Sequence, residues 1–266
     1  MPFARGDGAD LYYEVHGEGT PVLFCHGAGS NAATWWQQLP AFAPRHRCIT
    51  VDLRCFGRSR APLETFTVPV LVADALAVLD AAGAARAVVV GQSLGGMVGL
   101  QLALRHPERV AGFVACDSSL AIDHAGLLET LKTRALTHAA VSIEQRSLGR
   151  WFLEHRPALA ALYAQINHFN PSAYAHAPDA WRAALARLHE PGSLVPMDAL
   201  RRVACPTLLL VGREDPIVPA SVMHEVAARV AGSEVVIVDD AGHSAYFEQP
   251  DAVNRHVLEF IARRVG

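Results

Sequence analysis

The sequence predicts an α/β protein with a mostly parallel central sheet, helices on both faces of that sheet, and one helical insertion. Short apolar runs alternate with longer helical patterns through residue 117, and the same alternation resumes after residue 202. This alternation is typical of strands joined by helices in a parallel sheet. Residues 118–202 show helical periodicity only, and a chain of 266 residues is long enough for one large domain of this class.

The first half of the chain contains the elements expected of such a sheet. The apolar, β-branched runs predict strands at residues 11–15, 21–25, 48–52, 87–90 and 110–116. The first run follows a Gly-Asp-Gly turn at residues 6–8, which indicates an opening hairpin. Helices are expected at 67–82, with Thr67 as N-cap and Gly83 just past the end, and at 94–105.

After residue 202 the pattern predicts strands at residues 207–211 and 234–238, with helices at 220–230 and 250–264. The chain therefore divides into a core of residues 1–117 and 203–266 and a helical insertion of residues 118–202. The insertion is rich in Ala, Leu, Arg and His and carries several aromatic residues, among them Trp151, Phe152 and Trp181.

Composition narrows the class of function. Apolar residues make up 51% of the chain and charged residues 18%, as in compact globular enzymes. The net charge of -3 and the scattered basic residues argue against nucleic acid or an anionic membrane as partner. The insertion and the core both lack an uninterrupted apolar run of about 18 residues, so we expect no membrane span.

The N-terminal residues lack the apolar stretch of a signal peptide, so we expect a cytoplasmic protein. The cysteine count is odd and no Cys-x-x-Cys is present, so most of the five cysteines are expected to be small buried side chains in a reducing compartment. No cluster of residues has the spacing of a metal site, and no glycine-rich phosphate loop opens a helix. We expect neither a metal nor another cofactor.

The strongest local motif is Gly-x-Ser-x-Gly at residues 91–95, with Ser93 at its centre. It lies between a β-branched strand and a helix, which is the context of a nucleophile elbow. Glycines leave room for the sharp turn, and the helix N-terminus offers unpaired N–H groups. The alternative is an ordinary serine in a glycine-rich turn.

A serine hydroxyl needs a base, and His243 is the best candidate among thirteen histidines. It lies in the loop after the last predicted strand, which a parallel sheet places at the same edge as Ser93. An acid must orient the imidazole. Asp215 and Asp117 each follow a strand that ends at this edge, and the alternative for each is a turn or helix-capping aspartate.

Backbone N–H groups must also stabilise the developing oxyanion. Leu94, which follows the candidate nucleophile, can supply one of them, and Ala28 in the turn after the strand at 21–25 can supply the other. The alternative for the segment at 26–29 is a tight glycine-rich turn without a catalytic role.

At this point the chain resembles the α/β-hydrolase superfamily, in its branch of small esterases, enol-lactonases, cofactor-free haloperoxidases and C–C bond hydrolases. The resemblance covers nearly the whole chain. Besides the elbow, it rests on four motifs: His-Gly at 26–27, Asp-x-Arg at 52–54 continuing to Ser59, Gly-x-x-Asp at 212–215, and Gly-His at 242–243 with Glu-x-Pro at 248–250. The Gly-x-x-Asp match favours Asp215 over Asp117 as the acid.

The resemblance implies that residues 118–202 form a helical cap over the active site, and we expect Trp151, Phe152 and Trp181 to line or support the substrate pocket. Two departures stand out: Cys55 occupies a position where the family often has glycine, and Ser244-Ala245 follows the histidine where C–C hydrolases more often carry an aromatic residue. Serine at the elbow excludes the relatives that use aspartate there, the epoxide hydrolases and haloalkane dehalogenases.

We therefore expect hydrolysis of a small-molecule ester or lactone through an acyl-enzyme. Two alternatives remain at this point: a C–C hydrolase acting on a dienoic acid, and a hydrolase-fold receptor that binds a small molecule with little turnover. The oligomeric state does not follow from the sequence.

Overall fold

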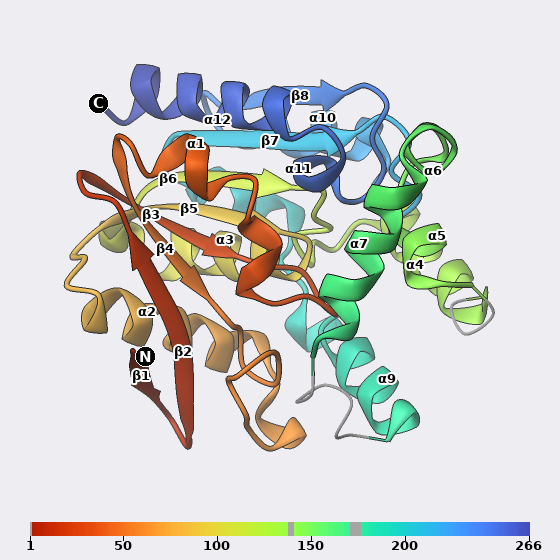
Figure 1. The fold of residues 1–266 in the computed structure, drawn as a ribbon, viewed down its shortest axis with the longest axis horizontal. Helices are drawn as coiled ribbons and strands as arrows, with labels where there is room; N and C mark the ends of the chain where they lie inside the picture. The colour runs from red at the N-terminus through yellow and green to blue at the C-terminus, as the bar shows by residue number, and fades with distance from the viewer. Residues whose placement is uncertain (1, 138–140, 171–176) are drawn as a thin grey trace.

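A computed structural model of the chain describes residues 2–137, 141–170 and 177–266. Its centre is an eight-stranded sheet in the order β1-β2-β4-β3-β5-β6-β7-β8 (Figure 1). β1 pairs with β2 and β2 with β4 in antiparallel fashion, and the remaining neighbours are parallel. The strands are β1 Phe3–Gly6, β2 Ala9–His16, β3 Thr20–Cys25, β4 His46–Val51, β5 Ala87–Gln92, β6 Val110–Cys116, β7 Thr207–Gly212 and β8 Glu234–Val238.

Helices cover both faces of the sheet, and the sheet separates two apolar cores. One face carries α2 (Val68–Ala81), α3 (Leu94–Arg105) and α10 (Ala220–Ala227), and the other carries α1 (Leu39–Phe42) and α12 (Pro250–Arg264). The central strands are buried on both sides, which explains why β5 reads as an almost unbroken apolar run. The short helix α11 (Ala245–Glu248) precedes α12, and 3₁₀ turns occur at Ala32–Trp35, Leu63–Thr65 and Pro107–Arg109.

The predicted fold class is confirmed. Four elements begin and end where the sequence places them: α3, β6, β8 and α12. The hairpin also forms, because β1 pairs with β2 across the turn. The turn of residues 32–35 and helices α1 and α11 are each only four residues long, too short for a periodic signal. Thr67 is the N-cap of α2, although its side chain makes no capping hydrogen bond.

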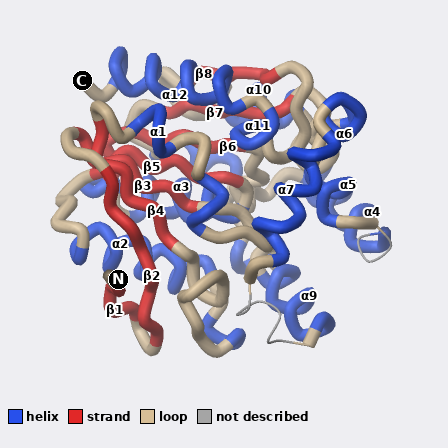
Figure 2. Tube along the Cα trace, viewed as in Figure 1, coloured by secondary structure: helices blue, strands red, loops and turns tan. Residues whose placement is uncertain are grey.

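The described residues of the segment 118–202, hereafter the cap, lie beyond the carboxyl ends of the parallel strands (Figures 1 and 2). Their helices are α4 Ala125–Thr137, α5 Ile143–Ser147, α6 Arg150–His155, α7 Pro157–His168 and α9 Pro178–Arg187, followed by 3₁₀ turns at Pro191–Ser193 and Met197–Arg202. The chain enters and leaves the cap side by side, because Ile122 and Val195 form a parallel bridge and Asp123 N–H donates to the Val195 carbonyl over 2.8 Å.

Candidate active site

Ser93 occupies a strained turn between β5 and α3. Its backbone has φ 48° and ψ -108°, a region that residues with a side chain rarely adopt. The two glycines of the motif permit this turn. A Cβ on Gly91 would lie 2.2 Å from the Gly95 carbonyl oxygen, and a Cβ on Gly95 would lie 2.0 Å from the Cys25 carbonyl oxygen. The tight packing of α3 against the sheet therefore holds Ser93 at the strand's carboxyl end.

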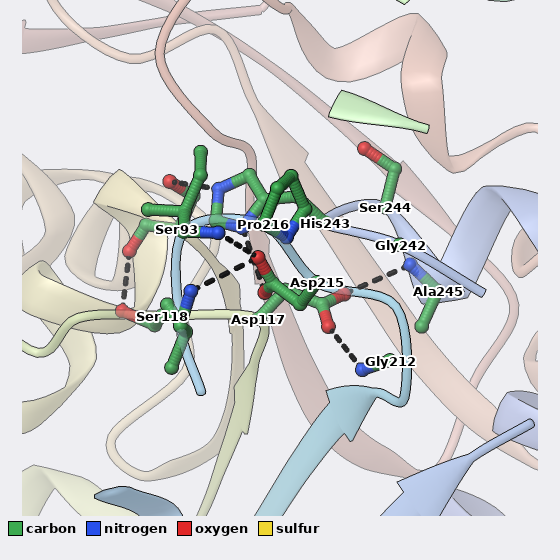
Figure 3. Close-up of polar contacts among 12 residues, drawn as sticks. Ser93, Asp117, Ser118, Gly212, Asp215, Pro216, Gly242, His243, Ser244 and Ala245 are labelled. Carbon is green, nitrogen blue, oxygen red and sulfur yellow. Dashed lines mark hydrogen bonds and ion pairs between the residues drawn. The ribbon is translucent and has the colours of Figure 1, made fainter. Parts of the chain in front are cut away.

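Ser93, His243 and Asp215 lie within hydrogen-bonding distance of one another in series (Figure 3). His243 Nε2 is 3.0 Å from Ser93 Oγ, and His243 Nδ1 is 2.9 Å from Asp215 Oδ2. Nδ1 must donate to the carboxylate, which leaves Nε2 as the acceptor for the serine hydroxyl. The other oxygen of Asp215 accepts the N–H groups of Ile217 and Val218, at 2.7 and 3.0 Å, so the carboxylate is fixed in orientation.

Several neighbours that the sequence did not single out hold Ser93 and His243 in place. Gln92 donates from Nε2 to the His243 carbonyl over 2.8 Å, and the His243 N–H donates to the Ser147 carbonyl over 2.6 Å. Ser118 donates from Oγ to the Ser93 carbonyl over 2.6 Å. These bonds join segments far apart in the chain, and the only local signal was the position of Gln92 beside the elbow serine.

Asp117, the rival acid, has different partners. Its side chain is buried, its Oδ1 accepts the Gly212 N–H, and its Oδ2 accepts the Ala245 N–H, both over 2.8 Å (Figure 3). Burial, with the nearby charge of Asp215 as a smaller cause, holds the pKa of Asp117 well above its usual range. The structure thus places Asp215 on the imidazole and uses Asp117 to join the end of β7 to the start of α11.

The His26-Gly27 turn lies beside the elbow. A Cβ on Gly27 would be 1.9 Å from Gln92 Oε1 and 3.2 Å from Ser93 Cβ. His26 is fully buried, with Nδ1 on the Gly27 carbonyl at 2.8 Å and Nε2 accepting the Leu53 N–H at 2.9 Å. Burial lowers the pKa of His26 to about 4, so the ring is neutral near pH 7 and acts as a fixed support for the turn.

The two residues proposed from sequence as oxyanion donors lie on the two segments that meet here, the His26-Gly27 turn and the elbow. Ala28 is exposed on the turn, and Leu94 is the first residue of α3. The cap also contacts the turn, because Asn170 Nδ2 donates to the Gly29 carbonyl over 2.7 Å while its Oδ1 accepts the Gly57 N–H over 2.8 Å. Hydrogen bonds from both the core and the cap therefore hold the turn in place.

The Asp-x-Arg segment at residues 52–54 stabilises the core through a buried ion pair. Arg54 is completely buried and forms two hydrogen bonds with Asp74, at 2.7 and 2.8 Å. Cys55 adopts φ 70°, the left-handed conformation that explains why glycine suits this position. All five cysteines are free and buried, and burial raises the pKa of Cys55 to about 11, which makes it a weak nucleophile.

Glu248 from α11 is a further buried carboxylate beside His243, for which the sequence suggested no role. Its Oε1 accepts the N–H groups of Gly242 and Ser244, at 2.9 and 3.1 Å, and its Oε2 accepts the Gly149 N–H of the cap at 2.7 Å. Burial raises its pKa to about 7, against the opposing effect of the three hydrogen bonds.

The three cap aromatics proposed from sequence as pocket residues lie in different surroundings. Trp181 packs against Phe56 and Phe66 of the core, with ring centroids 5.1 and 5.3 Å away. Trp181 is on α9, whereas Phe152 and Trp151 are on α6. Phe152 is buried with its ring centroid 6.1 Å from that of Phe247, and Trp151 stacks on His155 of the same helix at 4.5 Å. Each ring therefore has packing partners of its own.

A metal-binding cluster and a membrane-spanning helix are both absent from the described ranges. Within residues 2–137, 141–170 and 177–266, no three His, Cys, Asp or Glu side chains are grouped so that they could hold a metal ion. Over the same residues, none of the helices has both the length and the apolar character needed to cross a bilayer.

Comparison with known proteins agrees with this geometry. The chain is 31% identical to the protein named "Putative carbamate hydrolase RutD" of Azorhizobium caulinodans, over 98% of each chain. Among solved structures it resembles Est816, described as an N-acyl homoserine lactone degrading enzyme, with a TM-score of 0.84 and 29% identity over 97% of this chain and 100% of that one. It also resembles an esterase from Thermogutta terrifontis, with a TM-score of 0.81 and 27% identity over 96% and 94% of the two chains.

Residues 20–250 match the family described as the alpha/beta hydrolase fold. This match covers far more than half of the chain, and the sheet order, the elbow and the relatives all agree with it. The protein is a hydrolase that belongs to the α/β-hydrolase fold family.

Proposed function

We propose that the protein is a serine hydrolase that cleaves a small carboxylic ester or lactone through an acyl-enzyme intermediate. The observation that carries the proposal is the unbroken series of hydrogen bonds from Asp215 through His243 to Ser93 Oγ. The strained backbone of Ser93 points the same way, because such strain clusters at functional sites.

In this mechanism Ser93 Oγ attacks the carbonyl carbon while His243 Nε2 accepts its proton. Asp215 holds the imidazole in the required tautomer and stabilises the imidazolium that forms. The backbone N–H groups of Ala28 and Leu94 bind the oxyanion, each donor typically contributing about 10²–10³ in rate. His243 then protonates the leaving oxygen and later activates the water that releases the acid.

The relatives support an acyl substrate and widen the choice of its class. Est816 is described as acting on a lactone, and the A. caulinodans relative carries the name of a carbamate hydrolase. A carbamate is therefore the second candidate, since attack on its carbonyl uses the same nucleophile, base and oxyanion donors. The small-molecule substrate, the absence of a cofactor and the cytoplasmic location stay predictions.

The test compares the wild-type protein with Ser93→Ala and Ser119→Ala on p-nitrophenyl esters of graded acyl length, a lactone panel and an aryl carbamate. Ser119 is a matched control because its Oγ also lies near a histidine nitrogen, His189 Nε2 at 3.2 Å. We expect Ser93→Ala to lose on the order of 10⁴–10⁶ in kcat and Ser119→Ala to keep its turnover.

A folded Ser93→Ala protein that retains more than about a tenth of wild-type activity would contradict the mechanism, because a loss of less than about tenfold is far smaller than the expected loss. Tight binding of small molecules by the wild-type protein without turnover of any substrate would instead favour a receptor. Turnover restricted to a dienoic acid would favour a C–C hydrolase.

A further inference from the structure

Glu248 connects the cap to the loop that carries His243. We propose that Glu248 is a positioning residue, through which the cap sets the place of His243 relative to Ser93. The inference rests on the proposed function, because it assumes that His243 is the base. Glu248 itself touches neither reacting atom, and its side chain is 4% exposed.

One carboxylate serves two segments that are about a hundred residues apart. Its Oε1 accepts the N–H groups of Gly242 and Ser244, the two residues that flank His243, at 2.9 and 3.1 Å. Its Oε2 accepts the N–H of Gly149 in the cap at 2.7 Å. All three hydrogen bonds end on one side chain, so this arrangement fixes both segments to one group.

The two backbones also touch directly. The His243 N–H donates to the Ser147 carbonyl over 2.6 Å. A Cβ on Gly149 would lie 2.8 Å from the Gly242 nitrogen, and a Cβ on Gly242 would lie 2.3 Å from the Gly149 nitrogen. There is no room for a side chain between the segments, so a shift of residues 147–149 must displace the loop as well.

The position of the loop matters because the imidazole works at fixed distances. His243 Nε2 lies 3.0 Å from Ser93 Oγ, and a misplacement of about 1 Å can cost about 10²-fold in rate. A glutamine at position 248 has one carbonyl oxygen and one NH₂ group. It cannot accept hydrogen bonds on both sides, so it must lose either the cap contact or the loop contacts.

Three variants separate positioning from general support. Glu248→Gln removes the hydrogen bonds of residue 248 either to the cap or to the His243 loop. Gly149→Ala leaves the carboxylate intact but forces the cap backbone away from Gly242. Glu214→Gln is the matched control, because Glu214 Oε2 accepts the Trp151 N–H of the same cap helix at 3.1 Å, and no hydrogen bond of its carboxylate to Gly242 or Ser244 is present among the described residues.

The measurements are kcat and KM for a p-nitrophenyl ester, the rate of Ser93 modification by a fluorophosphonate, and the melting temperature. We expect Glu248→Gln and Gly149→Ala to lose about tenfold or more in kcat and in modification rate, a fraction of the loss that full misplacement causes, with KM changed far less. Glu214→Gln should keep both rates even where its melting temperature falls.

The inference is overturned if Glu248→Gln and Gly149→Ala both fold, melt at lower temperature and keep wild-type kcat, since Glu248 is then only structural. Should Glu248→Gln fail to fold, Gly149→Ala decides alone. Failure of the proposed function gives a different result from failure of this inference. Ser93→Ala would then retain turnover whether or not the Glu248 hydrogen bonds to the cap and the loop are intact.

Discussion

Two buried aspartates lie near the imidazole, and hydrogen-bond partners distinguish them. Asp215 meets His243 Nδ1, whereas both oxygens of Asp117 accept backbone N–H groups. Asp117 contacts the loop that follows His243 at Ala245, so it supports the site without touching the imidazole. A sequence pattern that finds an aspartate after a strand cannot separate these two uses.

The substitutions Asp215→Asn and Asp117→Asn should therefore fail in different ways. Asp215→Asn favours the wrong imidazole tautomer, and we expect a loss of about 10⁴ in kcat with the fold retained. Asp117→Asn turns an NH₂ group toward a backbone N–H, which should cost about 1–3 kcal/mol of unfolding free energy and far less activity. Steady-state kinetics and urea unfolding on both variants check this, and a larger kcat loss in folded Asp117→Asn would contradict the assignment.

Glu248 predicts a pH dependence of stability. Its pKa is about 7 in the folded protein against 4.5 normally, so the folded state binds more protons than the unfolded state between these values. Stability from this group is full below pH 4.5 and is lost as the pH rises through 7, by about 3 kcal/mol. Glutamine does not titrate. The wild-type protein should therefore lose stability relative to Glu248→Gln between pH 5 and pH 8, as measured by urea unfolding, and a constant difference would refute the shift.

Among the secondary-structure elements, α3 is the one whose packing determines where Ser93 lies. It contacts β3, β5 and β6, and its buried glycines let its backbone approach the strands. A small residue is required at Gly95 because the Cys25 carbonyl oxygen occupies the place of a Cβ. The elbow thus depends on contact between a helix and a strand that is not adjacent to it in the chain.

Gly95→Ala should destabilise the protein by about 1–3 kcal/mol or more, as overpacking of a tight contact does, and should lower kcat because the elbow moves. Gly192→Ala is the control, since a Cβ there meets no atom within 4 Å. Thermal melting and ester turnover of both variants test the point. Equal stability of the two variants would mean that α3 can shift without cost.

In the whole molecule, the cap and the core meet through buried aromatic and polar contacts on several sides of the site. Trp181 joins α9 to the core through Phe56 and Phe66, and Phe56 in turn packs edge-on against His26 of the His26-Gly27 turn at 5.2 Å. A shift of α9 should therefore displace Phe56 and His26, and with them the turn beside Ser93.

We expect Trp181→Ala to lose about 2–3 kcal/mol of stability, below the 3–5 kcal/mol typical of fully buried large aromatics because the ring is only partly buried. The ratio of kcat/KM for medium and short acyl esters should change as well, with the pH profile kept. Trp151→Ala is the comparison, since that ring stacks on His155 of its own helix. A stability loss with an unchanged ratio would make Trp181 a packing residue only.

Local patterns in the chain were sufficient for the fold class, the principal strands and helices, and the placement of Ser93, His243 and Asp215 at strand ends. Periodicity, glycine spacing and chain order are properties of neighbouring residues, so they are visible in one dimension. The Gly-x-x-Asp resemblance favoured Asp215 as the acid, but only tertiary packing decided that both oxygens of Asp117 accept backbone N–H groups and that Glu248 accepts hydrogen bonds from the cap and the His243 loop together. The contacts of Asp117 and the cap contact of Glu248 join segments far apart in the chain, and their geometry exists only once the sheet and the cap have packed.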